Sequence, residues 1–270
     1  ILDKLTYASN FESLKSILNE DSVTFIKGSI GNNELTQNIF KKYLPDYVFN
    51  LAAETHVDNS IKNPSLFVKT NVLETQNFLD ETLKYFITLP KLKKNKFKFL
   101  HVSTDEVFGD IRKDEKPVLE NAPYKPSSPY SASKASSDHL VNSYYRTFGL
   151  PTLITNCSNN YGPYQHHEKL IPMSITNAIN DKEIPIYGDG SQIRDWLFVE
   201  DHARAIIKVF ENGKNGETFN IGGNNQLKNI DVVEKICSIL DELVPKKKKY
   251  FNQVKFVEDR PGHDSKYAVD

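Results

Sequence analysis

Short apolar runs alternate with helix-like segments over the first 158 residues, and this alternation limits the folds open to the chain. The runs VTFIKG, DYVFNLAA, FKFLHVS and PTLITNCS have the length of buried strands, and the segments between them carry apolar residues at helical spacing. Strands that alternate with helices form right-handed βαβ units around a parallel sheet. The pattern therefore predicts an α/β protein with a doubly wound parallel sheet.

The pattern loosens after about residue 158. A Pro- and Gly-rich stretch, NNYGPYQHHEKLIP, comes first, and helices are predicted at 170–181, 200–212 and 229–241, with short strands between them. We therefore predict two domains. Residues 1–158 form the parallel-sheet domain, and residues 159–270 form mainly a smaller mixed α/β lobe, with some strands returning to the first domain.

The composition excludes several classes of partner. The chain has 270 residues and a net charge of −1, so no strong overall field favours nucleic acid or an anionic membrane. No apolar run approaches the roughly 20 residues that a membrane span needs. The two cysteines, Cys157 and Cys237, lie far apart in the sequence, which favours a reducing cytoplasm over a disulfide framework.

The segment STDEVFGD places Thr104, Asp105 and Glu106 directly after the predicted strand FKFLHV. Ligands of doubly wound sheets bind beyond the carboxyl ends of the strands. Adjacent carboxylates repel each other, and burial near a sheet makes them harder to ionise. We expect the two acids to hold different protonation states and to act as an acid–base pair, rather than to form a solvated turn.

Tyr130 and Lys134 in PYSASK are four residues apart, on one face of a helix that Pro129 helps to begin. A free phenol has a pKa near 10 and is a poor base at neutral pH. A nearby ammonium is expected to lower the pKa of Tyr130 and to make it a usable base. Such a pair is common by chance, but here it follows a strand end that carries hydroxyl and carboxyl groups.

These motifs resemble the extended short-chain dehydrogenase/reductase family, and within it the dTDP-glucose 4,6-dehydratases. The resemblance runs along essentially the whole chain, through LDKLTYASN, NLAAETHVDNSI, VSTDEVFGD, PYSASKASSDHLV, NCSNNYGPYQ, PIYGDGSQIRDWLFVEDHARA, FNIGG and DRPGHDSKYAVD. It implies a Rossmann-like sheet domain, NAD as the cofactor, dTDP-glucose as the substrate and hydro-lyase activity. It also implies a cytoplasmic homodimer that pairs through the helix of Tyr130.

The resemblance implies a role for each candidate catalytic residue. Tyr130, assisted by Lys134, would take the proton of the sugar 4-hydroxyl while a hydride leaves C4 for NAD+. Glu106 would then remove the C5 proton, and Asp105 would protonate the departing 6-hydroxyl. The hydride would return to C6, which gives a 4-keto-6-deoxy sugar nucleotide. Thr104 would hydrogen-bond the 4-oxygen.

The resemblance also assigns binding roles, and no metal site is among them. Arg194 and Arg260 are expected to bind the diphosphate, because guanidinium groups suit bidentate phosphate contacts. Cofactor contacts are expected from Asp3, Ser29, Ile30, Ala52, Ala53, Thr70, Ser103, Tyr130, Lys134 and Asn156. Substrate contacts are expected from Thr55, His56, Thr104, Asn159, Glu168, Lys169, Leu170, Pro185, Tyr187, Arg194, Asn229, Arg260, His263 and Tyr267.

The chain departs from the family pattern in several places. It begins with ILDKLTYASN, without the strand and the Gly-x-x-Gly-x-x-Gly loop that cradle a dinucleotide, and it stops at KYAVD, so we expect a fragment of a longer enzyme. Ser29 stands where relatives have Asp, and Asn156 stands where they have Arg. Residues 166–167 are His-His in place of a Phe-Pro pair.

Several alternatives share parts of this pattern. A UDP-glucose 4,6-dehydratase would use the same chemistry, and one methyl group in a pocket is worth only about 1–3 kcal/mol. The pair Asp105 and Glu106 disfavours a GDP-mannose dehydratase and an epimerase. A non-catalytic nucleotide-sugar-binding protein is the alternative from another class, and the absent glycine loop is the one feature that favours it.

Overall fold

A four-stranded parallel sheet forms the centre of the protein, as the computed structural model describes it over residues 1–270. Its strand order is β3-β4-β5-β9, and each neighbouring pair is parallel. The order confirms the predicted doubly wound α/β class, and it brings a strand from the second half of the chain to the first half. The strands are β3 (Tyr47–Asn50), β4 (Lys98–Thr104), β5 (Thr152–Cys157) and β9 (Thr218–Ile221).

The first residues form a separate parallel pair, β1 (Leu2–Asp3) with β2 (Ile26–Lys27). Between them lie η1 (Phe11–Leu14) and α1 (Lys15–Leu18), and α2 (Asn33–Tyr43) follows. The Asn32 side chain begins α2 by accepting a hydrogen bond from the backbone N–H of Leu35 at 3.0 Å, which satisfies one of the free donors of the first turn.

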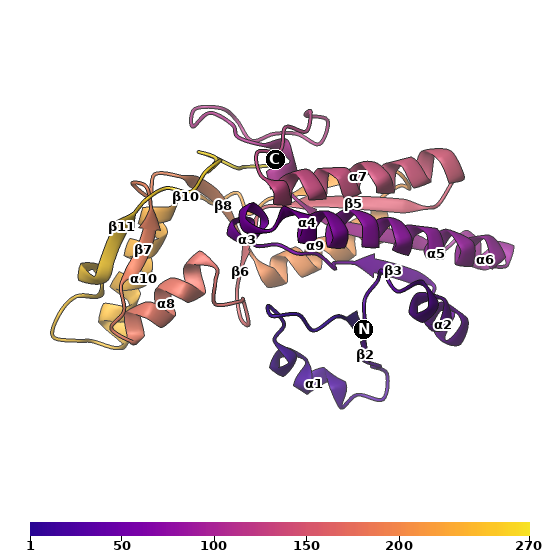
Figure 1. Ribbon diagram of the computed structural model, residues 1–270, viewed down its shortest axis with the longest axis horizontal. Helices are drawn as coiled ribbons and strands as arrows, with labels where there is room; N and C mark the ends of the chain where they lie inside the picture. Colours follow the sequence, from indigo (N-terminus) through magenta and orange to yellow (C-terminus); the bar gives the residue numbers. More distant parts are fainter.

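Helices cover both faces of the main sheet (Figure 1). Residues 64–88 form one continuous rod with a π-helical middle, and the rod lies beside α7. Ser128 and Ser131 form a capping box at the start of α7, and Gly149 ends the helix with φ 69°. The helices of this region are α3 (Val57–Lys62), α4 (Pro64–Phe67), η2 (Val68–Glu74), α5 (Thr75–Thr88), α6 (Lys91–Lys94) and α7 (Pro129–Phe148).

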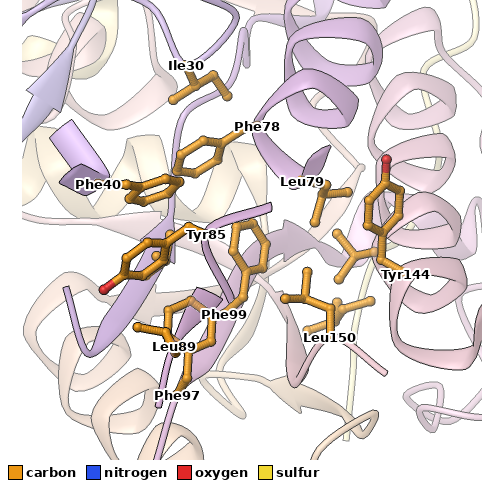
Figure 2. Packing of buried hydrophobic residues seen from close by; sticks show 13 residues of the cluster. Ile30, Phe40, Phe78, Leu79, Tyr85, Leu89, Phe97, Phe99, Tyr144 and Leu150 are labelled. Atoms are coloured by element: carbon orange, nitrogen blue, oxygen red, sulfur yellow. The ribbon is translucent and has the colours of Figure 1, made fainter. Parts of the chain in front are cut away.

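Strand β4 supplies side chains to two separate cores because successive residues of a strand point to opposite faces. Phe99 packs in the larger core with Phe78 of α5 and Val141 of α7, part of which Figure 2 shows. Leu100 packs on the other face with Ile206 of α9 (Val199–Asn212). Both β4 side chains are fully buried, so the sheet is covered on both sides.

The remaining strands lie apart from α5 and α6, on the opposite side of the molecule in Figure 1. Sequence patterns missed β6, β10 and β11, which are three or four residues long. The domain boundary at residue 158 stays a prediction. This part contains a sheet of order β10-β8-β6, a parallel pair of β7 and β11, and three helices: β6 (Asn159–Tyr161), α8 (Leu170–Ile179), β7 (Ile184–Tyr187), β8 (Ile193–Phe198), β10 (Gln226–Lys228), α10 (Asn229–Leu243), η4 (Tyr250–Gln253) and β11 (Val254–Val257).

A membrane anchor is not found among the helices, since none of them combines the length and the apolar character that a bilayer crossing requires.

We predict that Phe99→Ala lowers the free energy of unfolding by roughly 3–5 kcal/mol, because it leaves a cavity between β4 and the helices that cover it. Urea unfolding followed by circular dichroism measures the change. The control is Leu92→Ala on α6, whose side chain is 81% exposed, and this variant should stay within about 0.5 kcal/mol of the wild type. A similar loss in both variants would contradict the packing described here.

Candidate active site

A cavity of about 350 Å³ opens beyond the carboxyl ends of β4 and β5. All residues that were expected to bind the substrate, except Thr104, line it, and Glu106 lines it too. They come from the segment after β3, the turn after β4, the stretch from β6 to α8, the strands β7 and β8, the start of α10 and the C-terminal segment. Residues separated by more than 200 positions in the sequence therefore meet around one cavity.

Cationic side chains are fixed in the wall of this cavity. Arg194 is buried, and its guanidinium donates to the carbonyls of Ile193 at 2.7 Å and Asp264 at 3.0 Å while it lies over the Tyr267 ring. The Nη1 of Arg260 lies 3.4 Å from Asp58, and its Nε has no partner although it is buried. Two guanidinium groups and Lys169 share the lining with Asp58, Glu106 and Glu168, and they are the groups of the cavity that suit contacts to a diphosphate.

Asp58 is a lining residue that sequence reasoning missed. Its carboxylate accepts a hydrogen bond from the Tyr187 hydroxyl at 2.9 Å and pairs with Arg260, so it joins α3 to two predicted substrate residues of the C-terminal half. The sequence signal for Asp58 was its place in the three residues HVD at the end of the LAAETHVD motif. Of these three residues, the histidine alone was assigned a role. The other lining residues without a predicted role are Val57, Gln165, Met173, Ile186 and Trp196, whereas Asn160 was expected, like Asn159, to offer its amide to the substrate diphosphate or to the nicotinamide side.

The two acids follow the end of β4 in a short helical turn, η3 (Asp105–Phe108). The Thr104 hydroxyl caps this turn: it accepts from the N–H of Glu106 and donates to Asp105 Oδ1, both at 3.3 Å. Asp105 Oδ2 and Glu106 Oε2 are buried and have no hydrogen-bond partner within the protein. Each such atom costs about 1–3 kcal/mol, so the two oxygens are available for a bound molecule.

The surroundings of the two acids push their protonation states apart. Burial and the neighbouring Glu106 charge raise the pKa of Asp105 well above its usual range. Burial also raises the pKa of Glu106, but Arg194, Arg260 and Lys169 act against that rise. Both carboxyls are thus harder to ionise than free ones, Asp105 the more so, while three cations favour the ionised form of Glu106. The roles of Asp105 as acid and Glu106 as base stay a prediction.

Tyr130 and Lys134 lie buried on the first turns of α7, close to the same strand end. The expected lowering of the Tyr130 pKa was wrong in this structure. Burial and the charge of Glu106 raise the pKa of Tyr130, with an opposing effect from the Thr104 hydroxyl. The Lys134 ammonium instead donates to the carbonyl of Val102 at 2.9 Å and lies 3.3 Å from His101 Nε2, so its bonds are directed to β4.

A second cavity, of about 640 Å³, lies over β1, β2 and β3. Asp3, Ser29, Ile30, Ala52, Ala53 and Thr70 line it, as expected of the cofactor residues. A carboxylate at the end of β1 suits ribose hydroxyls, and the two alanines leave room for a close approach to the backbone. The residues present therefore fit NAD. The pair Lys4 and Glu74, 2.9 Å apart, also lines this cavity and was not predicted.

Four expected cofactor residues line neither cavity: Tyr130 and Lys134, described above, and Ser103 and Asn156. Ser103 and Asn156 belong to a different group of contacts. Both are buried and donate hydrogen bonds to Asp138 Oδ2, at 2.8 Å and 3.2 Å. The structure thus places them in a polar network behind the strand ends instead of against a ligand. The parallel register explains this position, because Ser103 and Asn156 are direct partners on β4 and β5.

The parallel sheet, the Tyr130–Lys134 pair and the two cavities define an extended short-chain dehydrogenase/reductase of the kind that acts on nucleotide sugars. Comparison with known families narrows this class. The family model described as GDP-mannose 4,6 dehydratase matches residues 1–270, and the chain belongs to that family.

The relatives that match this chain over its whole length include dTDP-glucose 4,6-dehydratases. The enzyme of Salmonella typhimurium is 53% identical over 277 residues, with 100% of this chain and 77% of the relative covered. The enzyme of Haemophilus influenzae is 52% identical, with 81% of the relative covered. A solved dTDP-glucose 4,6-dehydratase from Streptomyces venezuelae with NAD bound superposes with a TM-score of 0.89 at 39% identity, over 100% of this chain and 77% of that one. The predicted resemblance is confirmed.

The protonation of Asp105 predicts a pH-dependent stability. Its folded-state pKa lies above the unfolded value near 3.8, so the stability contributed by its neutral form is present below the unfolded pKa and is lost as the pH rises through the folded pKa. Asp105→Asn cannot ionise. The wild type should therefore lose stability relative to this variant between about pH 5 and about pH 9.

Urea unfolding of both proteins at the two pH values measures this difference. The exposed Asp21→Asn serves as the control, and its difference from the wild type should not change with pH over that range. A constant difference between the wild type and Asp105→Asn would show that Asp105 is ionised in the folded protein throughout.

Proposed function

We propose that this protein catalyses the NAD-dependent dehydration of dTDP-glucose to dTDP-4-keto-6-deoxyglucose. The observation that carries the proposal is the pair Asp105 and Glu106, which stand in different electrostatic surroundings at a strand end and each keep a buried oxygen without a partner. The Glu106 side chain faces a cavity that also presents Arg194 and Arg260. A sugar joined to a diphosphate needs both kinds of group.

When bound, NAD+ supplies an acceptor for the hydride of C4 and the donor that returns it to C6. Tyr130 takes the proton of the 4-hydroxyl as that hydride leaves. Because burial and Glu106 raise the pKa of the phenol, nearby positive charge has to favour this transfer, and Lys134 on the next turn supplies it. Thr104 next to Tyr130 holds the 4-oxygen in line.

The elimination uses the two acids in opposite roles. A ketone at C4 acidifies the C5 proton, and the Glu106 carboxylate, held ionised by the cationic wall, removes it. Asp105 keeps its proton at neutral pH and delivers it to the departing 6-hydroxyl, so that water leaves. The proton taken by Glu106 returns to C5 as C6 is reduced, so Glu106 regains its initial state. Asp105 has lost a proton to the water and Tyr130 holds the proton of the 4-hydroxyl, so a proton transfer from Tyr130 to Asp105 restores both groups.

The nucleotide half of the substrate fits the remaining wall. Tyr187 and Pro185 from β7 offer apolar surface for the base, and Asn229 lies beside them. Support for thymidine comes from the named relatives at 52–53% identity. A solved UDP-glucose 4-epimerase from Thermotoga maritima also shares the fold, at 27% identity and a TM-score of 0.84, so UDP-glucose is the comparison substrate.

We predict that the protein, incubated with NAD+ and dTDP-glucose, yields a product that has lost one water, as mass spectrometry detects. Glu106→Gln should lower this rate by at least about a hundredfold, because it removes the base for C5. In deuterated water the wild type should place deuterium at C5, and Glu106→Gln should not. Tyr130→Phe should block the first oxidation and so prevent both events.

Glu20→Gln, a change at an exposed acid, is the matched control and should keep the wild-type rate. Turnover of UDP-glucose alone would keep the mechanism and overturn the substrate. A protein that binds dTDP-glucose but releases no water from either sugar would support the alternative of a non-catalytic binding protein.

We further propose a cytoplasmic homodimer that pairs through the rod of α4, η2 and α5 together with α7. Support comes from apolar side chains left exposed along these helices, with Val68 53%, Leu73 52% and Phe148 55% exposed. Sedimentation equilibrium should give a dimer for the wild type and a monomer for Leu73→Lys, while the control Leu92→Lys stays dimeric. A wild-type monomer would overturn this assembly.

A further inference from the structure

Lys134 is a buried cation that needs a compensating charge. Its side chain is on a residue only 3% exposed, and its ammonium hydrogen-bonds the backbone carbonyl of Val102. A carbonyl accepts a hydrogen bond but does not neutralise the charge. An uncompensated buried ammonium would lose its proton instead, because burial disfavours the charged form.

Most titratable groups that face Lys134 from the surrounding elements are neutral. On β4, burial and Lys134 lower the pKa of His101 well below its usual range, so the ring carries no charge. On β5, burial raises the pKa of the Cys157 thiol to about 12. Tyr124, on the loop before α7, has a pKa raised by burial and by Asp138. None of the three offers a negative charge near neutral pH.

Asp138 is the remaining group, one helical turn beyond Lys134 on the same face of α7. Its Oδ2 accepts hydrogen bonds from Ser103 at 2.8 Å, from Tyr124 at 3.0 Å and from Asn156 at 3.2 Å. Three donors on one oxygen favour the ionised carboxylate, which has only acceptors to offer. Its residue is fully buried, so this ionised group has no contact with water.

The other oxygen of Asp138 is directed to the lysine side of the network. Oδ1 is buried, has no hydrogen-bond partner and lies 3.5 Å from His101 Nε2. The same ring nitrogen lies 3.3 Å from the Lys134 ammonium. The Ser137 hydroxyl also lies 3.2 Å from Nε2, and the amide of Asn50 lies 3.1 Å from the other ring nitrogen, Nδ1. The carboxylate and the ammonium thus approach the same nitrogen of a fixed neutral ring.

We propose that Asp138 is the counter-ion that keeps the Lys134 ammonium charged, with both groups against Nε2 of His101, and that it is thereby a positioning residue for the Tyr130–Lys134 pair. This inference rests on the proposed function for its kinetic consequence alone. The charge of Lys134 matters because the proton transfer at Tyr130 depends on nearby positive charge. Asp138 itself touches neither cavity.

The direct test follows the titration of Lys134 by NMR. The ¹³Cε resonance of this lysine, assigned by its loss in Lys134→Met, is recorded against pH in the wild type and in Asp138→Asn. The variant keeps the shape of the side chain but removes the charge, so the titration midpoint should fall by about one to three pH units. An unchanged midpoint would overturn the proposal, whether or not the protein turns over any substrate.

The matched control is Glu81→Gln on α5. Glu81 is also a buried helical acid, but it pairs with Lys84 at 2.7 Å, away from Asp138. This variant should leave the Lys134 midpoint in place. Asp138→Glu keeps the charge and should restore most of the midpoint that Asp138→Asn loses. A fall of the same size in Glu81→Gln would show that the effect is a general one of destabilisation.

The kinetic arm separates positioning from a merely structural role. If water loss from dTDP-glucose is observed, the alkaline limb of the kcat–pH profile should move to lower pH in Asp138→Asn, in step with the Lys134 midpoint. A purely structural defect would lower kcat equally at all pH values. If the wild type shows no turnover, the proposed function fails while the NMR midpoint still decides the role of Asp138.

If Asp138→Asn does not fold, a measurement on the wild-type protein tests the proposal instead. Its Asp138 ¹³Cγ resonance at about pH 8 should be that of a carboxylate, since burial, opposed by Lys134 and the three donors, raises the pKa of Asp138 to about 6. A neutral carboxyl at that pH would overturn the assignment of Asp138 as the counter-ion.

Discussion

The parallel pairing of β4 with β5 is the interaction on which the rest of the structure depends. The register runs without a break from Phe99 opposite Thr152 to Thr104 opposite Cys157. Alternate β4 side chains fill the cores on the two faces of the sheet, and the strand then ends where its next residues can meet a ligand. The same strand binds Lys134 through the carbonyl of Val102. One strand therefore fixes the core and the distance between the base helix and the acids.

Charge burial at this strand end explains why the acids differ. Asp105 and Glu106 are neighbours in sequence, yet Arg194, Arg260 and Lys169 all act against the rise in the pKa of Glu106, whereas Arg194 is the cation that acts on Asp105. Those cations come from the C-terminal half of the chain, whereas the acids come from the N-terminal half. The acid–base pair is thus complete only when both halves are assembled, and binding of a diphosphate to the same cations would weaken their hold on Glu106 as catalysis begins.

Periodicity was sufficient to predict the main sheet, whereas the residues that line the cavity of about 350 Å³ were named from the family resemblance and not from local patterns. The sequence predicted a helix that begins near Pro129 and carries Tyr130 and Lys134, and α7 begins at Pro129. Short strands such as β6 escaped, since three residues carry no measurable period. The prediction of a lowered pKa for Tyr130 was also wrong, because the spacing of residues along a helix gives no information on burial or on the charge of Glu106. The hydrogen bonds of Ser103 and Asn156 to Asp138 could not be predicted either, because they depend on the pairing of Ser103 on β4 with Asn156 on β5.

That network gives a physical reason for Asn156 at a place where an arginine was the expected residue. A guanidinium at this buried position would bring a second cation beside Asp138 and would compete with Lys134 for its negative charge. The amide of Asn156 donates to Asp138 without adding charge, and it also bonds the carbonyl of Thr104 at the end of β4. Asn156 therefore connects Asp138 to the end of β4, from which the turn with Asp105 and Glu106 begins. Because it adds no charge, the carboxylate of Asp138 remains the counter-ion of Lys134. A substitution at this point of the sheet would consequently alter the charge of Lys134, although Asn156 contacts neither cavity.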